Sequence, residues 1–167
     1  MSSTSPRAVH DTETRVTGAD HDALRLWLRL LATTNSLEAL VRGRLQAHFG
    51  TTLARFDYLA QLERVPEGLR MRELSERLMV TGGNVTGLTD GLEDEGLVTR
   101  ESEPDDRRAF RVRLTPAGRR AFRTMAGDHE RWIVKAFSAL SAREIAQLRG
   151  LLGRIKDHVR SGVGGQT

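Results

Sequence analysis

Apolar side chains recur at three- and four-residue intervals along most of the chain, which is the spacing of helices with one buried face. A first helix is predicted from about Asp20 to Phe49, and it is ended by Gly50, a residue type that readily adopts the left-handed conformation after a helix. Its apolar row consists of Leu24, Trp27, Leu28, Leu31, Leu37, Leu40, Val41 and Leu45. Residues 1–19 lack this spacing and residues 161–167 are rich in glycine, so a flexible arm and a flexible tail are expected there.

Three shorter helices are predicted next. Thr52 can cap a helix that stops at Val65-Pro66, because the residue before a proline avoids the helical conformation. A short helix over about 71–78 follows, and then a helix over 82–95 that ends at Gly96. The sequence therefore predicts two helices joined by a tight turn between residues 71 and 96.

A hairpin and a further helix come directly after this pair. Leu97–Arg100 and Phe110–Leu114 have the composition of strands and are separated by a polar loop that contains Pro104. Thr115-Pro116 starts the next helix, which continues to about Leu140, with a hydroxyl cap and proline at the first position. Helix, turn, helix and then an arginine-tipped hairpin is the order that places one helix in a major groove of DNA and a loop in the adjacent minor groove.

The last predicted helix carries a regular apolar row. Ser141 and Glu144 have the spacing of a capping box at its start. The row alternates separations of three and four residues, as in a coiled coil, and consists of Ile145, Leu148, Leu152, Ile155 and Val159. This face could pack on its own domain or on a second copy of the chain. We favour a homodimer, because the middle of the chain suffices for a compact core and the outer helices then need another surface to cover them.

The distribution of charge along the chain supports a polyanionic partner more strongly than the net charge does. The net charge of the 167 residues is only +4, with 38% hydrophobic and 29% charged residues. Between Arg100 and Arg123, however, eight arginines stand against four acidic residues. We expect this local surplus to face a phosphate backbone.

Other features exclude several classes of protein. The chain has no cysteine, which rules out disulfides, thiolate metal sites and thiol-based peroxide sensing. Its five histidines are scattered without a paired spacing, so no metal and no cofactor are expected. There is neither a signal peptide nor an apolar run long enough to span a membrane, so we expect no membrane partner and a cytoplasmic location.

Four segments together carry a family resemblance: LSERLMVT, NVTGLTDGLEDEGLV, DDRR and RVRLTPAG. With the motifs LE-x-x-GLV, D-x-R and LT-x-x-G at these spacings, the sequence resembles the MarR family of winged helix-turn-helix transcriptional regulators. The resemblance implies a mainly α fold with a small β-hairpin wing, in a single domain over 20–160. The winged core would span about 53–118, flanked by dimerisation helices over about 20–49 and 116–160. It also implies a homodimer that binds a pseudo-palindromic site on double-stranded DNA, usually as a repressor.

The resemblance places the recognition helix at Gly82–Glu95. Its buried side is expected to be Val85, Leu88 and Leu92, which leaves Asn84, Thr86, Gly87, Thr89, Asp90 and Gly91 toward the groove or solvent. From these we expect DNA contacts by Asn84, Thr86, Gly87 and Thr89, although Asn84 could equally cap the helix. Relatives often carry arginine in place of Gly87, so the glycines either allow a close approach to the groove or weaken base readout, and both explanations remain open.

In the wing, the D-x-R signature falls on Asp106 and Arg108. The resemblance implies that Arg108 enters the minor groove, that Asp106 orients it, and that Arg107 contacts a phosphate. The alternative is an arginine-rich loop that is merely solvated. Arg100, Arg111 and Arg113 are weaker candidates, since alternate strand residues point away from DNA.

A small-molecule effector is also implied by the resemblance, in a pocket between the first, second and fifth helices. An aromatic acid, a phenol or an acyl-CoA would suit an apolar cleft that holds one cation. The candidate contacts are Trp27, Asn35, Arg44, His48, Phe56 and Tyr58, each of which could instead be structural or solvated.

Two rival classes remain. An enzyme is disfavoured because the sequence has no nucleophile elbow, no phosphate loop and no metal-ligand spacing, and Asp105-Asp106 is surrounded by arginines. The alternative function is a winged-helix module for protein contacts without direct DNA binding. The glycine-rich recognition helix without basic residues keeps that alternative open.

Overall fold

The computed structural model describes residues 21–103 and 106–162, and the side chains of residues 103 and 106–109 are outside the description. The predicted arm at 1–19 and most of the predicted tail lie outside the described residues. The chain divides into two compact units, residues 1–50 and residues 51–167, and each is described by itself.

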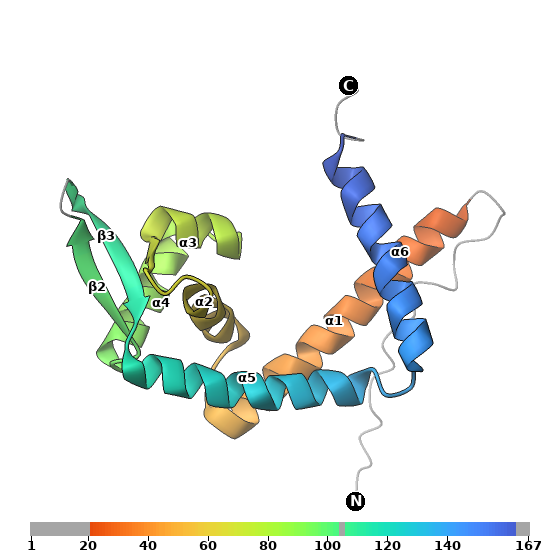
Figure 1. Cartoon of the computed structure of the whole chain (residues 1–167), viewed down its shortest axis with the longest axis horizontal. Helices are drawn as coiled ribbons and strands as arrows, with labels where there is room; N and C mark the ends of the chain where they lie inside the picture. The colour runs from red at the N-terminus through yellow and green to blue at the C-terminus, as the bar shows by residue number, and fades with distance from the viewer. Residues whose placement is uncertain (1–20, 104–105, 163–167) are drawn as a thin grey trace, which may run out of the picture. The chain divides into compact units, whose positions relative to one another are not determined.

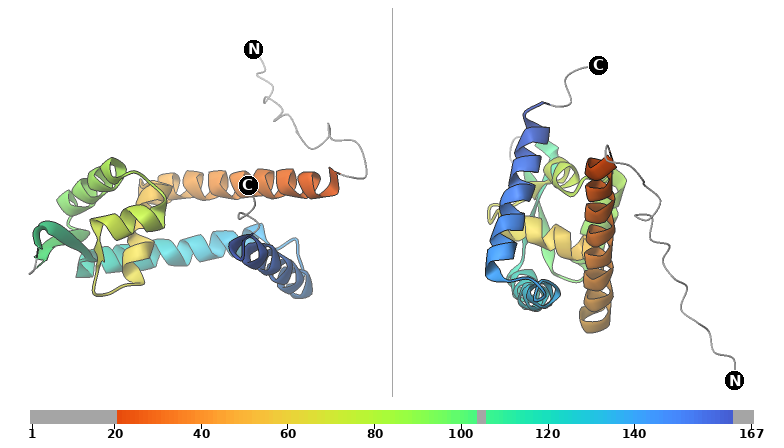
Figure 2. Two further views of the ribbon diagram at one scale, coloured as in Figure 1. Left: turned by 90° about the horizontal axis from the view of Figure 1, so that it is seen from above. Right: turned by 90° about the vertical axis from the view of Figure 1, so that its right-hand side faces the viewer.

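The first unit contains one long helix. Helix α1 spans Asp22–Phe49 without interruption (Figure 2). Gly50 follows in the left-handed conformation, with φ of 61°, and its N–H donates to the carbonyl of Gln46 at 3.1 Å. The predicted helix and its glycine cap are confirmed.

In the second unit, three short helices follow in the predicted places: α2 (Leu53–Glu63), α3 (Met71–Leu78) and α4 (Gly82–Asp94) (Figure 1). Thr52 caps α2, since its hydroxyl accepts a hydrogen bond from the backbone N–H of Arg55 at 3.3 Å. The turn between α3 and α4 is closed by Met79 in the left-handed conformation, with φ of 54°. Ser75 fixes the same turn by donating its hydroxyl hydrogen to the carbonyl of Val80 at 2.6 Å.

The second unit also contains a three-stranded antiparallel sheet, with strand order β1-β3-β2, whose first strand lies between α2 and α3 in the chain. Strands β2 (Val98–Glu103) and β3 (Asp106–Leu114) form the predicted hairpin, and both are longer than expected. Strand β1 (Leu69–Arg70) was not predicted, because two residues are too few for a sequence pattern. Gly68 precedes it with φ of 87°, and a Cβ there would lie 2.5 Å from the carbonyl oxygen of Val112, so this crossing needs glycine.

Two longer helices complete the unit: α5 (Pro116–Ala136) and α6 (Ala142–Arg160). Thr115 caps α5 by accepting from the N–H of Gly118 at 3.0 Å. A Cβ on Gly118 would lie 1.9 Å from the carbonyl oxygen of Leu97, so the glycine lets α5 pass directly over the start of the hairpin. The predicted capping box of α6 is present, with the N–H of Ser141 donating to Glu144 at 2.8 Å.

The core of the second unit lies among α2, α3, α4, α5 and the sheet. Its buried apolar residues are Phe56, Tyr58, Leu59, Leu62, Leu69, Leu74, Val85, Leu92, Val98, Val112 and Met125. None of the described helices is both long and apolar enough to cross a bilayer. The fold is the mainly helical winged helix-turn-helix that the sequence predicted.

Candidate nucleic-acid interface

Helix α4 presents one face to the core and the opposite face outward. Val85 and Leu92 are fully buried, whereas Asn84, Thr86 and Gly87 are exposed. The expected outward position of these last three residues is therefore confirmed, and their contact with DNA stays a prediction. Leu88, which was expected in the core, is only half-buried.

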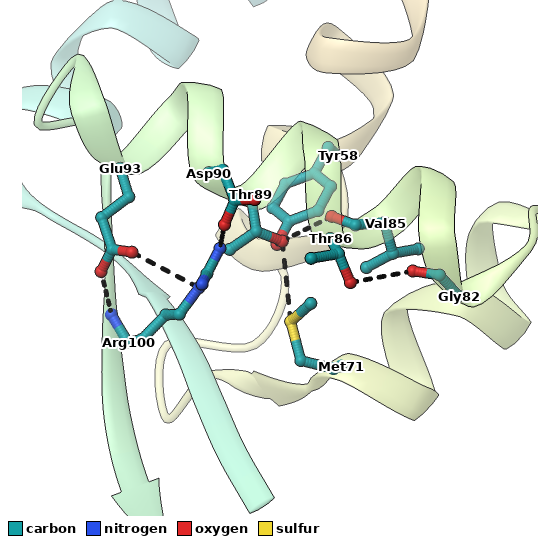
Figure 3. Close-up of polar contacts among 9 residues, drawn as sticks. All are labelled: Tyr58, Met71, Gly82, Val85, Thr86, Thr89, Asp90, Glu93 and Arg100. Carbon is teal, nitrogen blue, oxygen red and sulfur yellow. Dashed lines mark hydrogen bonds and ion pairs between the residues drawn. The ribbon is translucent and has the colours of Figure 1, made fainter.

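The structure corrects the prediction for Thr89, which lies in the core and not on the outer face. It is fully buried, because it stands four residues after Val85 and three before Leu92 and so shares their face. Its hydroxyl donates to the carbonyl of Val85 at 2.7 Å and lies 2.6 Å from the hydroxyl of Tyr58 (Figure 3). Since a hydroxyl has one hydrogen to give, Tyr58 is the donor in that pair.

Tyr58 connects α2 to α4 through this hydrogen bond. Burial raises the pKa of the Tyr58 hydroxyl from its ordinary value of 10.0 to about 12. The neutral phenol that can donate to Thr89 is thus the form present at physiological pH. The pair fixes the rotation of α4 about its own axis, and with it the direction of the exposed face.

The first turn of α4 is open. Thr81 precedes the helix but its side chain makes no capping hydrogen bond, so the first backbone N–H groups have no side-chain partner from the cap. Asn84 does not cap the helix either. The hydroxyl of Thr86 donates to the carbonyl of Gly82 at 3.0 Å, which leaves its methyl group and oxygen lone pairs exposed. An uncapped helix start suits an anion such as a phosphate.

The glycines of α4 have no structural cause inside the described fold. A Cβ on Gly82, Gly83 or Gly87 would meet nothing within 4 Å, and none of the three has a positive φ. A Cβ on Gly91 would lie in ordinary contact with the side chain of Arg55, at 3.8 Å. The two explanations given for these glycines from sequence, close approach and weak readout, both remain compatible with the fold.

Several of the described arginines between residues 100 and 123 make contacts within the fold, and that the others face phosphates stays a prediction. Arg119 and Arg123 both pair with Glu63, at 2.8 and 3.2 Å, and so tie α5 to α2. Arg111 and Arg113 donate to the carbonyls of Gly68 and Glu67, at 2.9 and 2.7 Å. The charge count was correct, but it could not distinguish arginines used in the fold from those offered to a partner.

Arg100 also belongs to the fold, and sequence analysis missed its role. Its guanidinium pairs with Asp90, and its Nε lies 3.4 Å from Glu93 Oε2 (Figure 3). Its backbone N–H donates to Glu93 Oε1 at 3.0 Å. We call Asp90, Glu93 and Arg100 the Arg100 clamp, since they join α4 to β2. The sequence feature that could have revealed this role is that α4 has acidic residues and no basic one. Its carboxylates therefore need cationic partners from another element.

The wing residues Asp106, Arg107 and Arg108 lie at the start of β3, at the tip of the hairpin. Glu103 pairs with Asp106, and the register shifts between Ser102 and Glu103. The side chains of these three predicted contacts lie outside the described residues, so their contacts with DNA stay predictions.

The six candidate ligand contacts are not brought together within one unit. Trp27, Asn35, Arg44 and His48 lie on α1, and Arg44 is the one that is half-buried while the others are exposed. The remaining two, Phe56 and Tyr58, lie on α2 in the second unit.

Phe56 and Tyr58 contact different helices, although they are only two residues apart. The ring of Phe56 packs on Phe122 and His129 of α5, with centroid distances of 5.5 and 5.0 Å. Tyr58 is directed to α4 instead and has its hydroxyl bonded there. The expectation that both line one cleft with α5 is wrong for Tyr58, and for Phe56 it stays a prediction.

The apolar row of α6 is largely exposed within the described residues of the second unit. The helix has no buried residue, and the side chains of Ile145, Leu148, Leu152, Ile155 and Val159 are 38–63% exposed. The prediction that a second copy covers them remains open. In the described part of the chain, no cluster of three His, Asp or Glu residues could hold a metal ion.

Comparison with known proteins gives one consistent answer. A sequence model of the MarR family matches residues 49–109, from the end of α1 to the wing. The HTH-type transcriptional repressor YetL of Bacillus subtilis is 30% identical over 145 residues, which cover 82% of this chain and 79% of YetL. YkoM of the same organism, an HTH-type transcriptional regulator without an assigned role, is 35% identical over 89 residues, but only 58% of its length is spanned.

A solved structure agrees with the sequence comparisons. The MarR family transcriptional regulator from Silicibacter pomeroyi is 31% identical, with a TM-score of 0.72. The match covers 86% of this chain and 99% of that one.

Proposed function

Because this chain belongs to the MarR family of winged helix-turn-helix transcriptional regulators, which bind DNA and are not enzymes, we propose that it is a homodimeric repressor of a pseudo-palindromic promoter site. In each protomer, α4 enters a major groove and the hairpin tip enters the adjacent minor groove. A small ligand releases the protein from the site.

One observation carries the assignment of the DNA-contacting face. Helix α4 is held by Val85, Thr89 and Leu92 on one side, and Asn84, Thr86 and Gly87 are exposed on the other. The amide of Asn84 can pair with adenine, and the methyl group of Thr86 can contact thymine. The uncapped first turn of α4 adds backbone N–H groups that suit a phosphate.

The dimer is supported by α6. Its row of large apolar side chains is exposed at coiled-coil spacing, and water contact with such a row is unfavourable. A two-fold dimer presents two copies of α4 and two wings, and half-sites about one helical turn apart suit that symmetry. The name of YetL supports repression over activation, and the position of the site relative to the promoter decides between the two.

Release from DNA requires an effector, and we propose an aromatic acid, a phenol or an acyl-CoA as its chemical class. Among the candidate contacts, Arg44 or His48 on α1 would hold the carboxylate, and an aromatic side chain would contact the ring. Ligand screening by thermal shift with salicylate-like acids and phenols tests this part, since a ligand that binds only the folded state raises the melting temperature.

Arg108→Ala tests the DNA-binding part. We expect affinity for DNA selected by the wild-type protein to fall at least several-fold, because a narrow minor groove attracts the guanidinium, while the dimer stays folded. The measurement is a gel shift at moderate salt, with a salt titration in which log affinity falls linearly with log salt. Arg154→Ala, which removes the same charge from α6 outside the apolar row, is the matched control and should change affinity much less.

An unchanged affinity in Arg108→Ala would exclude the wing from the mechanism. Size-exclusion chromatography with and without the upstream intergenic DNA tests the rival function as a protein-interaction module. A protein that elutes unchanged with every DNA fragment supports that rival and contradicts the proposal.

A further inference from the structure

Acidic residues are the only charged side chains on the recognition helix. Helix α4 carries Asp90, Glu93 and Asp94, and neither lysine nor arginine. Phosphates line both sides of a major groove, so each unpaired carboxylate on a helix in that groove weakens binding by charge repulsion. How these carboxylates are neutralised therefore matters for DNA binding.

In the Arg100 clamp one guanidinium pairs with two of the three carboxylates and offsets one of their two negative charges. Asp90 and Glu93 are three residues apart, hence neighbours on the helix surface, and the Arg100 guanidinium approaches both (Figure 3). With the hydrogen bond from its backbone N–H to Glu93, one residue of β2 makes three separate contacts with α4. Asp94, the third acid, is exposed and has no described ion pair.

Arg100 is held by the protein and is not extended toward solvent. Its side chain is 24% exposed, and its partner across the sheet is Val112, which is fully buried. Val112 lies on β3, the strand that begins with the predicted minor-groove residues Asp106 and Arg108. The clamp thus connects α4, the proposed major-groove helix, to the hairpin whose tip is proposed to enter the minor groove. The connection runs through Arg100, which is paired with the buried Val112.

We propose, on the basis of the proposed function, that the Arg100 clamp sets operator specificity by fixing the angle between α4 and the hairpin. Helix and hairpin tip must reach adjacent grooves of the same duplex at once. If the angle between α4 and the hairpin varied, each of them could still contact DNA. The two would then no longer require a fixed distance between their contact sites in adjacent grooves. Arg100 is a positioning residue in this arrangement and not a phosphate contact.

Asp90→Asn and its control Asp94→Asn separate the clamp from simple charge. Both variants remove one negative charge from α4, and the two residues are one helical turn apart. Charge alone strengthens binding to any DNA in both variants. The clamp predicts that Asp90→Asn alone lowers the ratio of operator affinity to affinity for an arbitrary fragment by about five- to tenfold, which lies within the range of coupling between contacting residues.

The probes are an operator fragment selected by the wild-type protein from random oligonucleotides and an arbitrary fragment of equal length. Thermal unfolding of each variant shows whether a change arises from folding. Asp90→Glu, which keeps a carboxylate, should retain most of the wild-type ratio. Hydroxyl-radical footprinting of Asp90→Asn should show weaker minor-groove protection on the operator, and methylation protection at guanine N7 should show that the major-groove contacts of α4 are kept.

Arg100→Gln distinguishes a positioning role from a phosphate contact. The clamp predicts that the specificity ratio falls as in Asp90→Asn, that the double variant is no worse than either single variant, and that the salt slope is unchanged. If Arg100 instead contacted a phosphate, the slope would fall by about one and the two effects would add.

The outcomes separate the two proposals. A wild-type protein without sequence preference contradicts both the proposed function and the clamp. If the wild-type protein selects an operator and Asp90→Asn behaves like Asp94→Asn, only the clamp is wrong. The clamp is also wrong if Asp90→Asn loses preference at a single base pair and adds to Arg100→Gln, since Asp90 would then read a base directly.

Discussion

Helices α4 and α6 both carry apolar residues at helical spacing, but those of α4 are mostly buried within the described fold and those of α6 are exposed. The apolar face of α4 is covered inside the fold, with Val85 and Leu92 fully buried. Helix α6 has a longer apolar row and no buried residue at all. The spacing of apolar residues shows that a face must be covered, but whether the same chain supplies the cover is a property of the tertiary structure.

The largest effect is expected from placing charge on the exposed apolar row of α6. Leu148→Glu combined with Leu152→Glu should convert the proposed dimer to a folded monomer, because four carboxylates would face one another across a two-fold interface. Loss of the second half-site contact should lower operator affinity by about a hundredfold or more. Analytical ultracentrifugation and gel shifts measure both, with Arg149→Glu on the same helix as the control. A double variant that stays dimeric would place the interface elsewhere.

Gly118→Ala tests the close packing of α5 against the start of the hairpin. The added Cβ would lie 1.9 Å from the carbonyl oxygen of Leu97, so α5 must move away from the hairpin. We expect the free energy of unfolding to fall by about 3 kcal/mol, the upper range for overpacking. Gly127→Ala on the same helix meets nothing within 4 Å and should raise it by about 0.5–1 kcal/mol instead. Equal stabilities in chemical denaturation would contradict the close approach at Gly118.

Tyr58→Phe tests how firmly α4 is held. Removing the hydroxyl leaves Thr89 without its donor in the core, which should lower the free energy of unfolding by about 1–2 kcal/mol. The measurement is urea denaturation at neutral pH. Thr86→Val, which removes an exposed hydroxyl from the same helix, should change stability much less.

Burial of the Tyr58 hydroxyl also predicts how stability depends on pH in the alkaline range. The pKa of Tyr58 is raised to about 12 in the fold from an ordinary value of 10.0. Its contribution to stability is fully present below pH 10 and is lost as pH rises from about 10 to 12, because the unfolded chain then releases the proton first. Tyr58 is the only tyrosine, so phenolate absorbance reports it alone. A titration midpoint near 10 in the folded protein would contradict a buried hydroxyl.

The smallest effect is expected at the start of α6. Ser141→Ala removes the acceptor for the backbone N–H of Glu144, and loss of such a cap costs about 1 kcal/mol of helix stability. The hydrogen bonds from Ser141 also lower the pKa of the Glu144 carboxyl. Its contribution is therefore present above the ordinary pKa and is lost as pH falls through the folded value. Thermal melts across acidic pH should show a weaker dependence in the variant; an unchanged melt would mean that the cap is not formed in solution.

The arginines and α4 show how far sequence reasoning reached into the site. The helix positions, the hairpin and the outward face of Asn84, Thr86 and Gly87 followed from spacing and from family resemblance, and the fold agrees. The burial of Thr89 did not follow, since threonine fits both an exposed and a buried face. The use of Arg100 did not follow either, because a charge count does not say which acid each guanidinium meets.

What the sequence alone determined is local: where helices begin and end, through Thr52, Gly50, Thr115 and Ser141, and where the hairpin lies. Caps and periodicity act within a few residues, so they can be read along the chain. The tertiary structure alone decided contacts between distant residues, such as Tyr58 with Thr89, 31 positions apart, and Arg113 with the backbone at Glu67, 46 positions apart. Such contacts depend on how separate elements pack. They decide which face of α4 is exposed and which arginines are not already used within the fold.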